Sequence, residues 1–304
     1  MISQELKEIL EILPTRELKN LAKKQDLSTT GNRMDIIKRL ETELEDIDIM
    51  EVWEQYQDAG DVSIHFAVMD DGVFDEFSNN PEMYFEQIGL KKFFNKDIKI
   101  TDLTITPTLL KINKRKNNGF ILYFIFRGKS TEFYLENKFE GVSRIQNGYI
   151  RGTASVILIP NHRLIQFRGR ERRIVKSIYN QIKDWFPESE LVSFTKEHAK
   201  FWINEETSKL SNIRFKLVGE NLSSISLTAP KHGDLKQEEE ELEKNWERGS
   251  CSGFYISADV SIEEKSRQLG LLFNIKQGKI YFKSYSSESD IKFVIERLIE
   301  CLGL

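Results

Sequence analysis

The chain has 304 residues, of which 39% are hydrophobic and 11% aromatic, so it can build a packed core and is not a wholly disordered protein. No apolar run approaches the ~18 residues of a membrane span, no signal peptide opens the chain, and two cysteines are too few for a disulfide framework or a four-ligand zinc site. We therefore expect an intracellular protein of about two domains, in the cytoplasm or nucleoid or in a eukaryotic nucleus, with no membrane contact and no cofactor.

Residues 13–40 predict two short amphipathic helices joined by a polar turn. Thr15 is a candidate N-cap of the first helix, whose apolar residues recur at helical spacing. Gly31 marks the turn, because a residue without Cβ adopts positive φ easily. Asn32 and Asp35 are spaced as the N-cap and N3 residues of the second helix. The residues expected in the core are Leu18, Leu21 and Ala22 of the first helix, and Met34, Ile36, Ile37 and Leu40 of the second.

Seven Lys or Arg and three acids lie between Pro14 and Leu40, a local charge of +4. Basic residues near a turn and a helix N-terminus suit phosphate groups. The pattern resembles the SAP family of small DNA-binding helical modules, in which a leucine-rich helix leads through a Gly-Leu pair and a loop glycine into a basic helix. The matching residues are Leu18, Leu27, Gly31, Arg33, Ile36 and Leu40.

Asp26 departs from that family, since it stands where a glycine is usual, and the end of the first helix is expected to differ there. LEM-like modules and the N-terminal domain of a transcription terminator have similar spacing. The resemblance covers residues 13–40 and implies DNA binding, although some SAP-like modules bind proteins.

Charge is unevenly distributed beyond this module. Residues 41–90 contain fifteen Asp or Glu and no Lys or Arg, whereas residues 111–183 contain sixteen Lys or Arg and four Glu. Two interpretations stay open. The segments either neutralise each other as adjacent faces of the fold, or the basic segment binds nucleic acid while the acidic one is turned away or imitates phosphate within the chain.

The predicted fold class is α+β, with a small SAP-like helical module over residues 1–48 and a larger antiparallel-sheet domain with helices. A leading helix is expected over 3–13 and a polar helix or linker over 41–57. Strands are expected over 99–104, 109–113, 119–127 and 131–135, with a hairpin loop over 114–119. A second hairpin over 149–168 leads into an amphipathic helix over 171–185, with Ile174, Val175, Ile178 and Ile182 pointing inward.

A strand, turn, strand and helix recur over 271–302, with Ile291, Val294, Ile295, Leu298 and Ile299 inward. Further strands are expected over 212–219 and 222–228, a long helix over 188–210, and a charged helix or loop with a solvated face over 236–248. This predicts two related halves, 49–186 and 187–304, with helices on one face of the sheet. The order of elements resembles the two-repeat saddle of the TATA-binding protein and of kinetochore subunits with similar folds, a likeness of fold that carries little about function.

Enzyme signatures are weak. The four histidines, His65, His162, His198 and His232, lack metal-ligand spacing and are expected at the surface or satisfied in the core. Asp102 with Glu136-Asn137-Lys138 could form a divalent-metal nuclease site, but an acid followed two residues later by Lys is common in a chain with 30% charged residues. A metal-dependent nuclease remains the least favoured alternative, and no catalytic residue or metal ligand is assigned.

The strongest binding constellation lies over 161–176, where arginines crowd a strand end, a loop and a helix start. Cations oppose the dipole at a helix N-terminus, which indicates an anionic partner, either nucleic-acid phosphate or an acidic protein surface such as residues 41–90 of this chain. A structural role, in which several of these arginines pair internally, is the other interpretation. We predict a non-enzymatic protein that binds double-stranded DNA, in a chromosome-, replication- or transcription-associated role. The alternative is a protein–protein scaffold of a chromosomal assembly that docks partners on its acidic or basic face. The expected nucleic-acid contacts are Lys19, Lys23, Lys24, Gly31, Asn32, Arg33, Lys38, Arg39, Lys114, Arg115, Lys116, Arg163, Arg168, Arg170, Arg172, Arg173 and Lys176.

Overall fold

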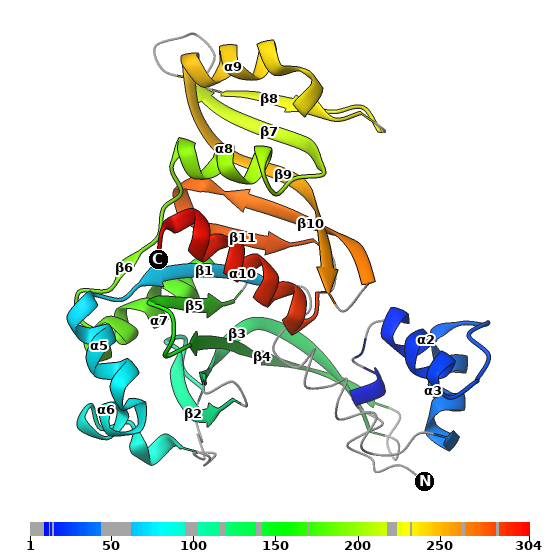
Figure 1. The fold of residues 1–304 in the computed structure, drawn as a ribbon. Coiled ribbons are helices and arrows are strands. Elements are labelled where there is room, and N and C mark those ends of the chain that lie inside the picture. The colour runs from blue at the N-terminus through cyan, green and yellow to red at the C-terminus, as the bar shows by residue number, and fades with distance from the viewer. Residues whose placement is uncertain are drawn as a thin grey trace.

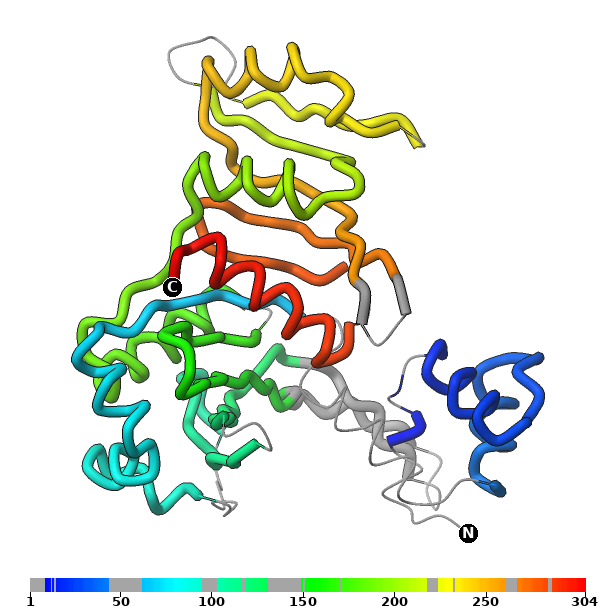
Figure 2. The backbone as a smooth tube through the Cα atoms, in the orientation of Figure 1, coloured from blue at the N-terminus to red at the C-terminus, as the bar shows by residue number. Residues whose placement is uncertain are grey.

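The computed structural model describes residues 9–11, 13, 15–43, 62–94, 103–115, 119–137, 142–169, 171–217, 224–231, 233–262, 265–283 and 286–304, and Figure 2 draws the others in grey. The side chains of 131–148, 150, 261–262 and 265–266 also lie outside this description. Most of the expected leading helix over 3–13, of the helix or linker over 41–57 and of the strand over 99–104 therefore falls outside the described residues.

The N-terminal helix pair consists of α2 (Thr15–Lys24) and α3 (Arg33–Glu43), as the apolar spacing predicts. Leu18, Leu21 and Ala22 of α2 are buried against Ile36, Ile37 and Leu40 of α3. Met34 does not join this core, because its side chain is 49% exposed. It lies two residues before Ile36, the first buried residue of α3, and so on the opposite side of the helix, and the prediction for Met34 is wrong.

The turn between the helices adopts the predicted conformation. Gly31 has a φ of +100°, which a side chain would strain. The Asp35 backbone N–H donates to Asn32 Oδ1 at 3.0 Å, and the Asn32 N–H donates to Asp35 Oδ2 at 3.0 Å. This reciprocal pair satisfies two amide groups at the start of α3, so the predicted cap is confirmed.

Asp26 shows how the chain ends α2 without the glycine usual in SAP modules. Its φ is +55°, the left-handed conformation. The Leu27 N–H donates to the Ala22 carbonyl at 2.8 Å, and the Asp26 N–H donates to the Lys23 carbonyl at 3.2 Å. These two bonds form a Schellman motif, which normally places glycine at the left-handed residue. Asp26 therefore ends the helix with the same motif that glycine usually forms, so the difference expected at this end is limited to a Cβ in a strained conformation and a negative charge at the negative end of the helix dipole.

Among the described residues, eleven strands form one sheet, and all of its paired strands are antiparallel (Figure 1). The order is β2-β3-β4-β5-β1-β11-β10-β9-β7-β8, with the short β6 beside β1. The strands are β1 (Ser63–Val68), β2 (Thr108–Lys114), β3 (Phe120–Asn137), β4 (Val142–Leu158), β5 (Leu164–Arg168), β6 (Glu190–Leu191), β7 (Lys209–Leu217), β8 (Ser224–Thr228), β9 (Gly249–Ile262), β10 (Lys265–Asn274) and β11 (Lys279–Phe282).

The helices of the sheet domain are α5 (Asp71–Asn79), α6 (Pro81–Gln87), α7 (Arg172–Trp185), α8 (Lys196–Asn204), α9 (Glu239–Arg248) and α10 (Glu288–Leu302), with short 3₁₀ turns η1 (Lys91–Phe93), η2 (Leu235–Gln237) and η3 (Ile275–Gln277). The α+β class and the antiparallel sheet are thus as predicted. The sheet also runs without a break across residue 186, where we expected the boundary between two halves, because β1 pairs with β5 on one side and with β11 on the other.

Two apolar cores lie on opposite faces of this sheet. Phe66 of β1 belongs to the core that also contains residues of α8, α9 and α10, whereas the next residue, Ala67, belongs to the core that contains residues of α5, α6 and α7. On β5, Leu164 and Ile165 divide in the same way. Because successive strand residues point to opposite faces, α7 and α10 cover different sides. Helices therefore cover one face in each half, as predicted, but not the same face.

Most predicted hairpins and helices are confirmed. The hairpin of β2 and β3, the hairpin of β4 and β5 that leads into α7, and the unit of β10, β11 and α10 are all present. The inward residues predicted for α7 are buried, as are those of α10 except Ile299, which is partly buried. Within the predicted 236–248 segment, Glu239–Arg248 form helix α9, but its face is not wholly solvated, because Trp246 packs edge-on against Phe215 at 4.9 Å between ring centroids.

The prediction of one long helix over 188–210 is wrong. Residues 190–194 are extended, and the Val192 N–H donates to the Phe66 carbonyl while the Phe194 N–H donates to the Ile275 carbonyl. Thr195 then starts α8 with a capping box that uses His198. The apolar residues at 191–194 fit an extended segment and a helix about equally well, and the pairing partners come from distant parts of the chain.

Replacing Asp26 with Gly is expected to stabilise the helix pair by about 1 kcal/mol, because it removes the left-handed strain and the unfavourable charge. Native-state hydrogen exchange should show amides of α2 exchanging roughly fivefold more slowly, since 1.4 kcal/mol corresponds to a factor of ten. Lys19→Gly, in the middle of the same helix, should speed exchange instead. Faster exchange in the Asp26→Gly variant would contradict the role given to Asp26.

Candidate polyanion-binding surfaces

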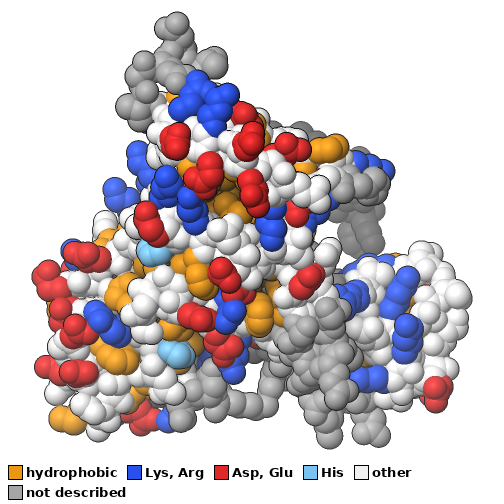
Figure 3. Space-filling view, turned by 45° about the horizontal axis from the view of Figure 1, so that its top comes forward, with side chains coloured by type: hydrophobic (Ala, Val, Ile, Leu, Met, Phe, Trp, Pro, Cys, Tyr) orange, Lys and Arg blue, Asp and Glu red, His pale blue; other side chains and the backbone are white. Residues whose placement is uncertain are grey.

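The helix pair carries exposed basic side chains. Lys19, Lys23 and Lys24 of α2 and Lys38 of α3 are exposed, and no ion pair in the described part of the chain involves them. Figure 3 shows Lys and Arg side chains on the helix pair at the right, with few acidic side chains among them. These four ammonium groups are therefore available to an anionic partner.

The two arginines of α3 have a different role. Arg33 donates to the Glu11 carbonyl at 2.6 Å and to the Thr15 hydroxyl at 3.2 Å. Arg39 donates from Nε to the Asp35 carbonyl at 2.9 Å, and its two other nitrogens donate to the Ser28 and Thr30 carbonyls. Both residues are half-buried. Arg33 connects the start of α3 to the start of α2, whereas Arg39 holds the 28–30 loop that precedes α3. The sequence pattern predicts both arginines as phosphate contacts, but in the structure their hydrogen bonds go to oxygens of the helix pair itself.

The basic segment over 161–176 is divided in a similar way. Arg163 donates to the Met69 carbonyl at 2.9 Å and lies 2.6 Å from the Asp71 carboxylate. Lys114 lies 2.9 Å from Glu82. Asp71 and Glu82 belong to the acidic segment over 41–90, so that segment neutralises part of the basic one, as the first of our two interpretations expects. Arg170 and Lys116 lie outside the described residues.

Arg172, Arg173 and Lys176 remain at the surface. They occupy the first turns of α7, their side chains are exposed, and none forms an ion pair within the described residues. Glu171, the residue before α7, makes no side-chain capping bond. The first turn of α7 thus combines backbone N–H groups with three cations, an arrangement that favours an anion.

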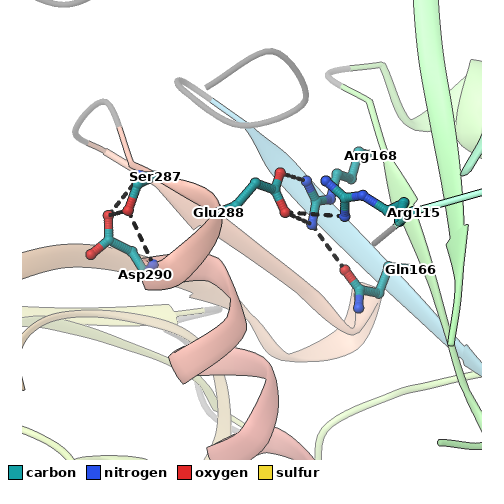
Figure 4. Close-up of polar contacts among 6 residues, drawn as sticks. All are labelled: Arg115, Gln166, Arg168, Ser287, Glu288 and Asp290. Atoms are coloured by element: carbon teal, nitrogen blue, oxygen red, sulfur yellow. Dashed lines mark hydrogen bonds and ion pairs between the residues drawn. The ribbon is translucent and has the colours of Figure 1, made fainter. Parts of the chain in front are cut away.

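Arg168 and Arg115 are withdrawn from the surface into a buried ionic cluster (Figure 4). Arg168 is 5% exposed and forms a two-pronged ion pair with Glu288, the first residue of α10. Arg115 Nη1 lies 3.2 Å from Glu288 Oε2, and Gln166 accepts a hydrogen bond from Arg168 at 3.2 Å. Burial works against ionisation of Glu288, but the two guanidinium groups outweigh it, and the pKa of this carboxyl is lowered.

A second buried pair lies beside the first. Asp290 is fully buried, caps α10 through the Ser287 backbone N–H and hydroxyl, and is ion-paired with Arg267 of β10. Together the two acids connect β5 and the end of β2 to the start of α10. Sequence reasoning missed Glu288 and treated Arg168 as a surface residue. The spacing of Ser287 and Asp290 as N-cap and N3 residues can be recognised in the sequence. The pairing of Arg168 with Glu288, 120 positions apart, cannot.

His65 differs from the expectation that each histidine is exposed or satisfied. It lies in the middle of β1 with 4% exposure, and its Nε2 atom has no hydrogen-bond partner within the described structure. Burial, the positive charge of Lys279 on the adjacent strand and that of Arg172 lower its pKa to about 4, against the effect of a hydrogen bond to the Gln277 backbone. His65 is therefore neutral at pH 7. His198, by contrast, accepts from the Thr195 N–H, and His232 lies outside the described residues.

The described residues contain no group of three or more His, Cys, Asp or Glu that could hold a metal ion. Asp102, Lys138 and the Glu136 side chain, which carry the nuclease alternative, lie outside the description. Both cysteines are free thiols, and burial raises the pKa of Cys251 to about 12. None of the helices in the described part of the chain has the length and apolar character needed to span a bilayer.

Comparison with known proteins adds no identity: the chain matches no protein-family model, and the search of curated proteins finds no match.

Glu288→Gln is expected to lower the free energy of unfolding by about 3 kcal/mol, because it leaves buried guanidinium groups without a compensating charge. Urea denaturation of the full chain measures this loss. Glu296→Gln on the same helix is the control, since Glu296 is exposed and pairs only with exposed Lys292 in the described residues, and its loss should stay below about 0.5 kcal/mol. Equal losses would show that the buried cluster contributes little.

Because the pKa of His65 is depressed in the folded state, the unfolded state binds the proton more readily, and stability falls as pH drops from 6.5 toward 4. Between pH 7 and pH 5 this group should account for about 2 kcal/mol of lost stability. His65→Asn removes the titration, so the variant should lose correspondingly less over that range in urea denaturation. If the free energy of unfolding falls equally in the wild type and the variant between pH 7 and pH 5, His65 is not neutral and buried in the folded state.

Proposed function

We propose that the chain is a non-enzymatic DNA-binding protein, in which the helix pair acts as a SAP-like module and the start of α7 provides a second contact. The helix pair binds duplex phosphates through its exposed lysines. Arg172, Arg173 and Lys176 bind a further stretch of backbone. Arg33 and Arg39 act indirectly: Arg33 connects α3 to the start of α2, and Arg39 holds the loop that leads into α3.

The observation that carries this proposal is the set of exposed lysines on the helix pair, Lys19, Lys23, Lys24 and Lys38, which no ion pair of the described structure involves. Elsewhere in the molecule several exposed cations lie beside a carboxylate, as Lys91 does beside Glu86 and Lys114 beside Glu82. Like charges gathered without counter-charges repel one another, so their free energy falls when a polyanion binds. The resemblance of the module to the SAP family favours DNA as that polyanion.

Two basic sites on one chain also raise affinity without any new contact. Once the helix pair is bound, α7 meets the same DNA at a high effective concentration, provided that both sites can reach it. Phosphate contacts position a protein but carry no sequence information. We therefore expect binding with a strong dependence on salt and a weak dependence on sequence.

Neutralising the module in the triple variant Lys19→Gln, Lys23→Gln, Lys38→Gln should weaken binding to a 30-base-pair duplex by roughly tenfold or more. It should also reduce the slope of log K against log salt by about 2 to 3, because each lost phosphate contact removes about 0.9. The triple variant Arg172→Gln, Arg173→Gln, Lys176→Gln should show a similar but separate loss. Fluorescence anisotropy at several salt concentrations measures both effects.

A triple variant of exposed lysines elsewhere, Lys183→Gln, Lys231→Gln and Lys292→Gln, has the same change in net charge and is the matched control. If it weakens binding as much as the module variant, the attraction is general and the module has no special role. If the wild-type chain fails to bind duplex at low salt, the DNA proposal is wrong, and the scaffold alternative takes its place.

A further inference from the structure

Among the described residues, no helix packs on one face of the sheet in the second half. The helices α8, α9 and α10 pack on the face that contains Phe254, Ile256, Leu271, Phe273 and Ile280. Alternate residues of the same strands point to the opposite face. There Leu272, Gln268, Lys283, Arg214 and Lys216 are exposed, and Leu272 is 37% exposed. We call this the open face, formed by β7, β9, β10 and β11.

Strand pairing places an apolar row across the middle of the open face. Tyr255 of β9 lies opposite Leu272 of β10, and Leu272 lies opposite Tyr281 of β11. The next row on one side contains Arg214, Gly253, Asn274 and Lys279, each paired with the one before it. On the other side, Lys283 is hydrogen-bonded through its backbone to Gly270. Two tyrosines and a leucine thus lie side by side, with lysines on both flanks.

Gly270 explains how Tyr255 is oriented. A Cβ atom at Gly270 would lie 2.6 Å from the Tyr255 hydroxyl oxygen and 3.3 Å from a ring carbon, so the ring leans over the bare backbone of β10. The Lys283 ammonium lies above the ring, 4.1 Å from its centroid. The ring is half-buried, with this ammonium over one of its faces. A nucleotide base that stacks on that face would take the place of the ammonium, which would then pair with the nucleotide's phosphate.

The charge of the open face indicates which kind of partner it binds. Arg214, Lys216, Lys279 and Lys283 are opposed by a single acid of this face, Asp259, among the described residues. An apolar row flanked by cations is complementary to a chain of flat apolar rings joined by anions. Adjacent strands lie about 4.8 Å apart, so Tyr255 and Tyr281, two strands apart, are about 10 Å from each other, which suits bases of nearby nucleotides. An apolar protein surface would match the row but not the flanking charges.

We infer that the open face binds single-stranded nucleic acid, with bases stacked on Tyr255 and Tyr281, apolar contact at Leu272, and backbone phosphates held by Lys279 and Lys283. The strand must be single, because base faces are hidden inside a duplex and only unpaired bases can stack on a protein ring. The inference extends the proposed function to a second form of nucleic acid, but it uses a surface on which the duplex proposal does not depend.

The test uses the full chain and fluorescein-labelled 12-mers of deoxythymidine and of uridine, which separate DNA from RNA, alongside the 30-base-pair duplex. Wild type should bind at least one 12-mer at low salt. Tyr255→Leu and Tyr281→Leu keep apolar bulk but remove the aromatic ring, and each should weaken 12-mer binding at least fivefold. Tyr255→Phe should bind as wild type does, because the ring remains. Lys283→Gln should lower the salt slope by about one.

The matched control is Tyr149→Leu, which removes an exposed tyrosine of β4, 53% exposed and in contact with Arg127, and should leave 12-mer binding unchanged. Thermal unfolding by circular dichroism verifies that each variant is folded. The Tyr→Leu variants should bind the duplex as wild type does, whereas the Lys19, Lys23 and Lys38 variant should lose duplex binding and retain most 12-mer binding. Failure of the duplex proposal is therefore distinguishable from failure of this one.

Three results would overturn the inference. The first is a wild-type chain that binds neither 12-mer at low salt. The second is a folded Tyr255→Leu, Tyr281→Leu double variant whose 12-mer affinity equals that of wild type. The third is a chain that self-associates in sedimentation and becomes monomeric on Leu272→Lys, which would assign the open face to contact between copies of this chain.

Discussion

The structure depends on the pairing of one short strand, β1, with both halves of the sheet. Its residues Ile64 and His65 pair with β5 on one side and with β11 on the other. The same strand contributes Phe66 to the core beneath α10 and Ala67 to the core beneath α7. The described helices of the second half pack on one side of the sheet, and those of the first half pack on the other. In the part of the chain that the structure describes, no helix therefore covers the opposite face of β7, β9, β10 and β11.

The buried ions near the start of α10 reinforce the same junction. Glu288 from the second half is ion-paired with Arg168 of β5 and with Arg115 after β2, both from the first half. Removing such charges from water is costly, and the mutual attraction compensates only when the geometry satisfies both partners. Arg168 directs both of its terminal nitrogens at the Glu288 carboxylate, and Gln166 accepts a further hydrogen bond from one of them. A hydrophobic contact would tolerate sliding of one half past the other, whereas this ion pair specifies one register.

Local patterns in the sequence were enough to predict most elements but not their roles. The spacing of Ile174, Val175, Ile178 and Ile182 identified α7 and its buried face, because helical periodicity is a property of neighbouring residues. The same reasoning failed for 188–210, where extended pairing with β1 and η3 determines the conformation. Which arginines are free also depends on distant partners. Arg168 and Arg172 look alike in the sequence, yet one is buried against Glu288 and the other is exposed.

The open face itself could not be predicted, since alternation along a strand shows that one side is polar but not whether a helix covers it. Tyr255, Leu272 and Tyr281 are spread over 27 residues of sequence and meet only through strand pairing. Alternation along each single strand therefore does not reveal a surface that is built from residues of several paired strands.

The start of α7 and the open face lie close enough to act on one group. Arg172 from α7 and Lys279 from β11 both depress the pKa of His65, although they belong to different halves of the sheet. The basic surface that the duplex proposal assigns to α7 therefore adjoins the strand at the edge of the open face. A polyanion bound at this junction would oppose the field of both cations, so the proton affinity of His65 would rise on binding. At pH 7 His65 would nevertheless stay neutral, because burial is the largest cause of its low pKa, so such coupling would be seen only at acidic pH.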